Sequence, residues 1–351
     1  MTNKKIDTLP KWQDIFKAWE LACNLKRIFL AFLWIIWTLT GIQVFTWIIS
    51  KITINYLNIY FAGFFKSVFK IFSYQSINIW QHKELLEFLS NTLKNNPEIF
   101  YTYIIICSVW IYIGWCLFGG SLHRDAGIDC VENKSFSIME LFNFVSKNFW
   151  VFFFAPFLPL FIGAIGIIIN IFLGYLTNIL EKHIGIPAGV SVAVLFIPIF
   201  IISILALISF IATFLSPSLS FCGIAIDELD QYDAVSHCVS FICYKTWRYI
   251  FYHIVALIYG LITAIFSVSV CTFIGFIMIK TFSIGLGRPI DLLNPSGING
   301  SWIMSFMAFV YSGMILGFVI SYYVTLKTHI YILLRYDMFE IPSNNYFKEK
   351  K

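Results

Sequence analysis

The chain has 351 residues, of which 59% are hydrophobic and 12% are charged, against about 25% charged residues in a typical soluble domain. The mean hydropathy of +0.80 excludes a soluble globular fold of this size. The net charge of +5 is small and gives no reason to expect nucleic-acid binding. Composition therefore predicts an integral membrane protein.

The N-terminal segment, residues 1–27, carries an apolar stripe at helical spacing: Trp12, Ile15, Phe16, Trp19, Ala22 and Cys23. This pattern predicts an amphipathic helix that lies on the cytoplasmic membrane surface and leads into the first span. A docking helix for a partner protein is the alternative. Because no small-residue cleavage site follows the first apolar run, we expect the segment to be retained and not cleaved as a signal peptide.

Six stretches have no Lys, Arg, Asp or Glu in their interiors: Ile28–Ser50, Phe100–Gly120, Trp150–Leu176, Val190–Ser216, Phe251–Ile279 and Trp302–Leu326. About 20 apolar residues suffice to cross a bilayer as a helix. The sequence thus predicts an all-α polytopic membrane protein with about six transmembrane helices in residues 28–326. Since ionisable residues inside spans usually mark ion paths or catalytic groups, these interiors disfavour proton-coupled transport.

The loop charges indicate an orientation. With a cytoplasmic N-terminus, the inside segments 1–27, 121–149, 217–250 and 327–351 hold 16 Lys and Arg residues, and the outside segments 51–99, 177–189 and 280–301 hold 8. This bias favours both termini in the cytoplasm. Residues 121–149 and 217–250 are then two cytoplasmic elbows, and 327–351 is a cytoplasmic tail.

The outside segment 51–99 is long for a loop and contains two apolar helical patterns. Tyr56–Phe72 carries two lysines one turn apart, which favours an interfacial or re-entrant helix over a seventh span. Lys83–Asn95 forms a second stripe that stops before Pro97. Together they predict a small extracytoplasmic helical cap, which either packs on the protein's own helices or offers a surface to a partner.

The two elbows resemble each other. Ser121–Ile169 and Ser218–Phe266, at a constant offset of 97, share nine identities in 49 positions, among them Trp150 with Trp247. In each copy a span ends in a polar stretch, an amphipathic helix follows, and the chain returns to the membrane at the tryptophan. This pattern predicts an internal repeat, which is common in transporters and also occurs in membrane proteins without a transport role.

The elbows also hold the candidate site residues. His123, Asp125 and Asp129 in the first elbow, and Asp227, Glu228 and His237 in the second, are of the types that bind metal ions. Their spacing fixes no ligand set, however, and a solvated elbow is the preferred interpretation. His123, Arg124 and Asp125 are the tightest group available for lipid chemistry. No catalytic motif occurs, so we assign no catalytic, cofactor-binding or metal-binding residue.

Other features point to helix packing. Gly313 and Gly317 in the sixth span allow two backbones to approach closely, within the chain by default and in a homodimer as the alternative. Asn170 and His253 are expected to bond to neighbouring helices. Prolines and glycines are expected to kink the third and fourth spans: Pro156, Pro159, Gly163, Gly166 and Pro198. The eight cysteines show no CxxC pair, so we expect free thiols.

Four segments carry a family resemblance: Leu9–Trp19, Gly119–Trp150, Asp227–Tyr249 and Ile330–Asp337. In these the chain resembles an uncharacterised family of polytopic membrane proteins from planctomycete-type bacteria. It is more loosely similar to the membrane domain of some glycerophosphodiesterases and to Yip-like helical domains. The resemblance implies an inner-membrane protein with about six helices and supplies no activity. The chain has no room for a phosphodiesterase catalytic domain.

Three classes of function remain open. The first is a non-enzymatic scaffold or subunit of a membrane complex, with the lipid bilayer and membrane proteins or further copies of the chain as partners. The second is a transporter or channel for an uncharged or lipidic substrate. The third is a membrane-embedded lipid enzyme. The uncharged spans favour the first, in the inner membrane.

Overall fold

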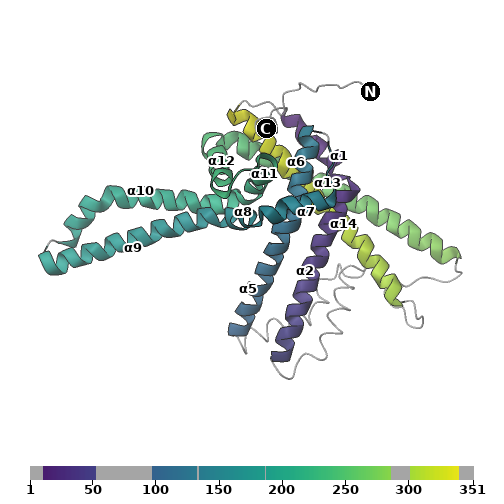
Figure 1. Cartoon of the computed structure of the whole chain (residues 1–351), viewed down its shortest axis with the longest axis horizontal. Coiled ribbons are helices and arrows are strands. Elements are labelled where there is room, and N and C mark those ends of the chain that lie inside the picture. The colour runs from purple at the N-terminus through teal and green to yellow at the C-terminus, as the bar shows by residue number, and fades with distance from the viewer. Residues whose placement is uncertain (1–10, 53–96, 133, 186, 286–300, 340–351) are drawn as a thin grey trace. The chain divides into compact units, whose positions relative to one another are not determined.

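The computed structural model of the protein describes residues 11–52, 97–132, 134–185, 187–285 and 301–339 (Figure 1). These residues form helices and turns and contain no β-strand. Among them are six stretches long and apolar enough to cross a membrane: Leu25–Phe45, Phe100–Val131, Phe149–Ile184, Gly189–Leu215, Thr246–Met278 and Phe309–Phe339. The protein is an all-α, multi-pass membrane protein, as its composition predicts. The proposed cap, with its two patterns, falls almost wholly outside the described residues.

The second and sixth spans extend further than their uncharged interiors suggest. Helix α5 (Pro97–Gly114) leads through a π-helical turn (Trp115–Gly119) directly into α6 (Gly120–Glu132). Helix α14 (Ser301–Phe339) continues through residues 327–339, which the sequence assigns to the tail. Tyr331 and Leu334 in this extension are fully buried. Both spans therefore end in charged helical extensions that pack within the protein.

The described residues divide into two compact units. The first, which we call the elbow unit, contains residues 11–15, 123–254 and 327–339. The second, which we call the span unit, contains residues 16–52, 97–122, 255–285 and 301–326. The boundaries fall within the 3-10 helix η1 (Trp12–Lys17), α6, α13 (Thr246–Gly285) and α14. The predicted division at residues 27 and 326 stays a prediction.

Aromatic stacking and glycines hold the span unit together. Helix α2 (Leu25–Ile52) pairs with α5 through Trp37 and Trp110, whose rings stack at 4.2 Å between centroids. Each indole Nε1 donates to the other residue's backbone carbonyl, at 3.2 and 3.0 Å. A Cβ added to Gly41 would lie 1.9 Å from Trp110 Nε1. Only glycine at this position therefore admits the stacked pair, which contributes about 1 kcal/mol beyond area burial.

Gly313 and Gly317 are used for packing within the chain. A Cβ at Gly317 would lie 2.7 Å from the carbonyl oxygen of Ile28 in α2, and one at Gly313 would lie 2.3 Å from the Phe32 ring. The default expectation for this motif is thereby confirmed. The close backbone approach is the one that small residues permit in membrane helices.

The N-terminal stretch is less regular than the predicted single helix. It forms a 3-10 helix, η1 (Trp12–Lys17), and a short α1 (Ala18–Ala22). In the span unit, Trp19 contacts the rings of Phe266 in α13 and Phe318 in α14, and Ser321 Oγ donates to the Ala22 carbonyl at 3.1 Å. The apolar stripe is thus directed in part at the protein's own helices, which corrects the expectation of simple surface anchoring.

Arg27, one of the Lys and Arg residues counted in the inside segment 1–27, is fully buried. Its Nη1 donates to the Leu21 carbonyl at 2.6 Å. A buried guanidinium is desolvated and does not face lipid headgroups directly. Its charge still counts in the loop bias, but its side chain packs within the helix junction.

The helices of the two elbows follow one another in a similar order. In the first, α6 is followed by α7 (Ile138–Lys147), α8 (Phe149–Phe154) and the third span; in the second, α11 (Pro217–Asp227) is followed by α12 (Gln231–Tyr244) and α13. Three boundaries recur 97 residues apart: the starts of α6 and α11, the ends of α7 and α12, and the starts of α8 and α13. The helix boundaries thus match the offset found in the sequence.

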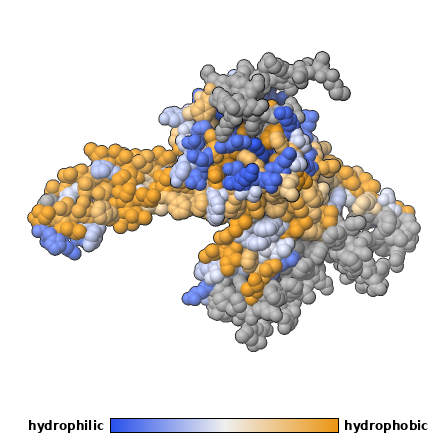
Figure 2. All heavy atoms as spheres, viewed as in Figure 1, coloured by the Kyte–Doolittle hydropathy of each residue, from blue (hydrophilic) through white to orange (hydrophobic). Residues whose placement is uncertain are grey.

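The third and fourth spans form a hairpin in the elbow unit. Helices α9 (Leu158–Ile184) and α10 (Ala188–Leu215) run side by side (Figure 1). Hydrophobic residues cover the hairpin along most of its length, and hydrophilic residues lie at its turn (Figure 2). A 3-10 turn (Ala155–Phe157) breaks the third span at Pro156, whereas α10 continues as one helix through Pro198. This surface suits contact with lipid.

Gly163 and Gly166 serve packing in this hairpin. Cβ atoms there would lie 3.3 Å from the Phe210 ring and 3.2 Å from the Ala206 Cβ of α10. Asn170 Nδ2 donates to Ser203 Oγ of α10 at 3.0 Å, so the expected bond to a neighbouring helix is confirmed.

His253 does not follow the same expectation. Its Nδ1 lies 2.9 Å from the Tyr249 carbonyl oxygen one turn earlier in α13. The predicted bond to a neighbouring helix is therefore wrong for His253, since its own helix supplies the acceptor. The eight cysteines are free thiols.

Candidate functional site

Polar side chains from three helices meet in the elbow unit: α6, α11 and the end of α14. Their contacts join positions about one repeat apart in the sequence, with separations of 99 to 108 residues. Figure 2 shows a hydrophilic face over the region of the elbow helices. We call the contacting residues the elbow cluster: His123, Arg124, Cys222, Asp227, Glu228, Thr328, Tyr331 and Arg335.

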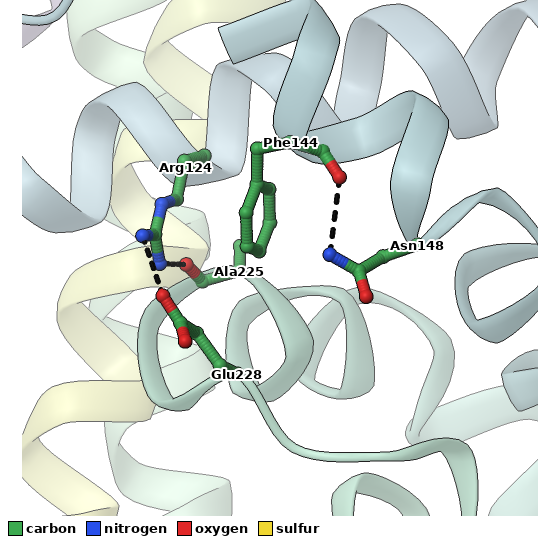
Figure 3. Close-up of polar contacts among 5 residues, drawn as sticks. All are labelled: Arg124, Phe144, Asn148, Ala225 and Glu228. Carbon is green, nitrogen blue, oxygen red and sulfur yellow. Dashed lines mark hydrogen bonds and ion pairs between the residues drawn. The ribbon is translucent and has the colours of Figure 1, made fainter. Parts of the chain in front are cut away.

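Arg124 in α6 binds the end of α11 (Figure 3). Its Nη1 donates to the Ala225 carbonyl at 2.6 Å, and its Nη2 donates to Glu228 Oε1 at 2.8 Å. The guanidinium lies 4.1 Å from the centroid of the Phe144 ring in α7. Because the last carbonyls of a helix lack partners and carry partial negative charge, Arg124 satisfies the end of α11 and joins it to α6 and α7.

The local sequence creates this acceptor. Helix α11 ends at Asp227, and the following residue, Glu228, adopts the left-handed conformation with φ 54° and ψ 35°. A non-glycine residue in this region is uncommon, and the turn leaves the Ala225 carbonyl available to Arg124. In α7, Asn148 Nδ2 donates to the Phe144 carbonyl at 3.0 Å (Figure 3). This bond satisfies the end of α7 next to the ring that Arg124 covers.

Asp227 connects α11 to the end of α14. Its carboxylate pairs with Arg335 and accepts a hydrogen bond of 2.6 Å from the Tyr331 hydroxyl. The Asp227 side chain is only 5% exposed and that of Arg335 13%. Burial raises the pKa of the Asp227 carboxyl, while the Arg335 charge and the Tyr331 hydroxyl act in the opposite direction. Removal of either charge would leave the other desolvated without its partner.

A second ion pair lies between α13 and α14. Arg248 pairs with Asp337, and the Tyr252 hydroxyl donates to the same carboxylate at 2.7 Å. The Arg248 side chain is 55% exposed, so solvent screens this pair far more than the pair at Asp227.

The thiol and imidazole groups of the cluster form a buried contact. Cys222 Sγ lies 3.3 Å from His123 Nδ1 and 3.9 Å from Thr328 Oγ1, and its thiol donates to the Ser218 carbonyl at 3.2 Å. Burial raises the pKa of the Cys222 thiol to about 12. Since the thiolate is the reactive form, burial disfavours nucleophilic chemistry by the Cys222 thiol at neutral pH.

The candidate trio of the first elbow does not form a shared site. His123 turns to Cys222, and Arg124 turns to the end of α11. Asp125, like His123, is buried. The interpretation of a solvated elbow is therefore wrong for His123, Asp125 and Asp227, whose side chains are buried.

The candidate metal ligands are likewise distributed. Among the residues that the structure describes, no group of three or more His, Cys, Asp or Glu side chains could hold a metal ion. Asp227 and Glu228 bind different arginines. The His237 ring packs against Phe339 at 5.0 Å between centroids. Asp227, Glu228 and His237 therefore contact side chains of other helices.

The end of α14 is the part of the site that sequence reasoning missed. Tyr331, Arg335 and Asp337 fall in the segment interpreted as a tail. The spacing of Tyr331 and Arg335, one helical turn apart amid Ile330, Leu333 and Leu334, continues the helix and could have indicated burial. Their partner, Asp227, could not have been identified from the sequence.

Comparisons with known proteins do not identify a protein similar to this chain. No family model, curated protein or solved structure matches the chain. The function must therefore be inferred from the helices and the elbow cluster.

Proposed function

We propose that the protein is a non-enzymatic scaffold or subunit of a membrane complex. The observation that carries this proposal is that charged side chains of the elbow cluster bind other parts of the same chain. Arg124 binds the end of α11 and Asp227 binds Arg335 and Tyr331. Groups engaged in this way fix helices relative to one another and do not present a charge to a substrate.

We also propose the inner membrane as its location, with both termini in the cytoplasm. The two-to-one excess of Lys and Arg in segments 1–27, 121–149, 217–250 and 327–351 supports this orientation. The elbow helices α6, α7, α11 and α12 would then lie at the cytoplasmic face, where they could receive a soluble or membrane partner. Reporter fusions after residue 351 and within residues 177–189 test the topology, since only the second should report an extracytoplasmic position.

Mild-detergent purification of the tagged native protein tests the scaffold proposal. We expect a defined set of membrane proteins, or further copies of the chain, to remain bound through size-exclusion chromatography. A variant that weakens the elbow cluster, Arg124→Ala, should lose these partners. Recovery of the chain alone, together with solute movement in liposomes, would contradict the proposal.

The enzyme alternative has its own test. His123→Gln and Asp125→Asn should leave the cellular lipid profile unchanged wherever the variant protein accumulates normally. Gly127→Ala serves as the matched control, because its Cβ would lie 2.4 Å from Ile226 and disturb the same packing without altering a polar group. A lipid change with the polar variants and none with Gly127→Ala would favour a lipid enzyme.

The second candidate is a transporter for an uncharged or lipidic substrate. The recurrence of three helix boundaries 97 residues apart favours it, because repeats with the same orientation build many transporters. Flux of labelled lipid or neutral solute in proteoliposomes, absent with empty vesicles, would support this candidate over the scaffold.

A further inference from the structure

The two points where the chain returns to the membrane after an elbow share a residue pattern. Each has a lysine just before the span and a tryptophan near its start. Lys147 lies two residues before the span that begins at Phe149, and Lys245 lies one residue before the span that begins at Thr246. We call them the return points: Lys147 with Trp150, and Lys245 with Trp247.

Both tryptophans are exposed on the structure. Trp150 is 64% exposed and Trp247 is 84% exposed. Phe154 and Phe251, one turn further along the spans, are also exposed. Tryptophan is enriched at membrane–water interfaces because its ring is apolar and its indole N–H is polar. Exposed rings at the start of a span are therefore suited to the level of the lipid headgroups.

Charge is distributed in the same way along both elbow helices. Helix α7 has Glu140 in its first turn and Lys147 in its last, and α12 has Asp233 in its first turn with Lys245 following its end. Lys147 is exposed and Lys245 is half-buried. The acidic side chains thus lie at the far ends of the elbow helices, and the basic ones lie beside the tryptophans.

We propose that each return point binds the headgroup of an anionic phospholipid. The lysine ammonium meets the phosphate while its aliphatic stem follows the apolar surface, and the tryptophan packs at the level of the glycerol backbone. The apolar, exposed faces of the spans continue from these rings and accommodate the acyl chains. The pattern holds whichever side of the membrane the elbows occupy, so it does not rest on the proposed orientation.

Native mass spectrometry of the purified chain in detergent micelles tests the proposal with phosphatidylglycerol and phosphatidylcholine as probes. Wild type should retain phosphatidylglycerol in preference, with two higher-affinity sites per chain. Because a basic residue near an anionic surface contributes about fivefold in association, Lys147→Gln and Lys245→Gln should each weaken one site by about that factor. The double variant should lose the preference.

The matched control is Lys182→Gln. Lys182 is an exposed lysine in the last turn of α9, at the opposite end of the third span from Lys147. It should leave the binding of both lipids unchanged. Equal binding of the two lipids by wild type, or an effect of Lys182→Gln as large as that of the elbow variants, would overturn the proposal. Unchanged helicity and elution volume would show that each variant is folded.

Discussion

The two elbows share a backbone plan but carry complementary charges. The first elbow supplies the cation Arg124, which pairs with Glu228 of the second elbow, whereas the second anion, Asp227, pairs with Arg335 of α14. At the equivalent positions, 97 residues away, Arg124 corresponds to Phe221 and Asp227 corresponds to Cys130. Copies with one backbone can thus bind each other once their polar residues differ. The comparison teaches that Arg124, which has no charged counterpart in the second elbow, supplies an ion pair and a helix-end contact between the two.

Asp227→Asn should give the largest effect on this asymmetry. The substitution keeps the shape and an acceptor for Tyr331 but leaves the Arg335 charge buried without its counter-ion. We expect a loss of about 3–5 kcal/mol in the free energy of unfolding, measured by denaturant titration in detergent. Asp233→Asn, on the exposed first turn of α12, is the control and should change little. Equal stability of the two variants would contradict the account.

Arg124→Ala should lower the free energy of unfolding by less, about 2 kcal/mol, in the same denaturant titration. It removes a contact with the end of a helix and a contact with an aromatic ring. Arg124→Lys keeps the charge but lacks the planar fork that reaches both Ala225 and Glu228. Arg124→Lys should therefore retain less than half of the unfolding free energy that Arg124→Ala loses. Full recovery by lysine would show that charge alone, without the paired geometry, joins the elbows.

Removal of the N-cap side chain should lower the stability of the two elbows by similar amounts. Ser137 caps α7 through Glu140 N at 3.3 Å, with Glu140 bonding back to Ser137 N at 2.8 Å. Asp230 caps α12 through the backbone N–H groups of Tyr232 and Asp233, both at 2.9 Å. Ser137→Ala and Asp230→Ala should each cost about 1 kcal/mol. A cost confined to one elbow in thermal unfolding would weaken the idea of equivalent copies.

The smallest effect is expected at Arg248. Its side chain is 55% exposed, so Arg248→Gln should change the unfolding free energy by less than about 1 kcal/mol. The loss should shrink further at high salt, because screening weakens exposed pairs. A larger, salt-independent loss would place Arg248 in the buried part of the unit.

The six spans could be predicted from the sequence because length and apolarity alone decide them. The charged extensions of two spans could not. Arg124 and Arg335 resemble solvated loop residues until their partners are known, and those partners lie 104 and 108 residues away in the chain. Pairing at such distances is set by helix packing, of which one sequence carries no local sign.

The glycine packing positions could be predicted only in part. Gly317 correctly indicated a close helix approach, since only a missing side chain fits there. Gly163 and Gly166 admit the close approach of α10, and the bend predicted at these glycines stays a prediction.

The most direct test of the central claim is a double-mutant cycle on Asp227 and Arg335. If the elbow cluster is structural, Asp227→Asn and Arg335→Gln should each lower the free energy of unfolding. In the double variant this free energy should fall by about 2 kcal/mol less than the sum of the two single-variant decreases. Additive losses, or single variants that unfold at the wild-type midpoint, would contradict the claim that these charges hold the helices of the elbow unit together.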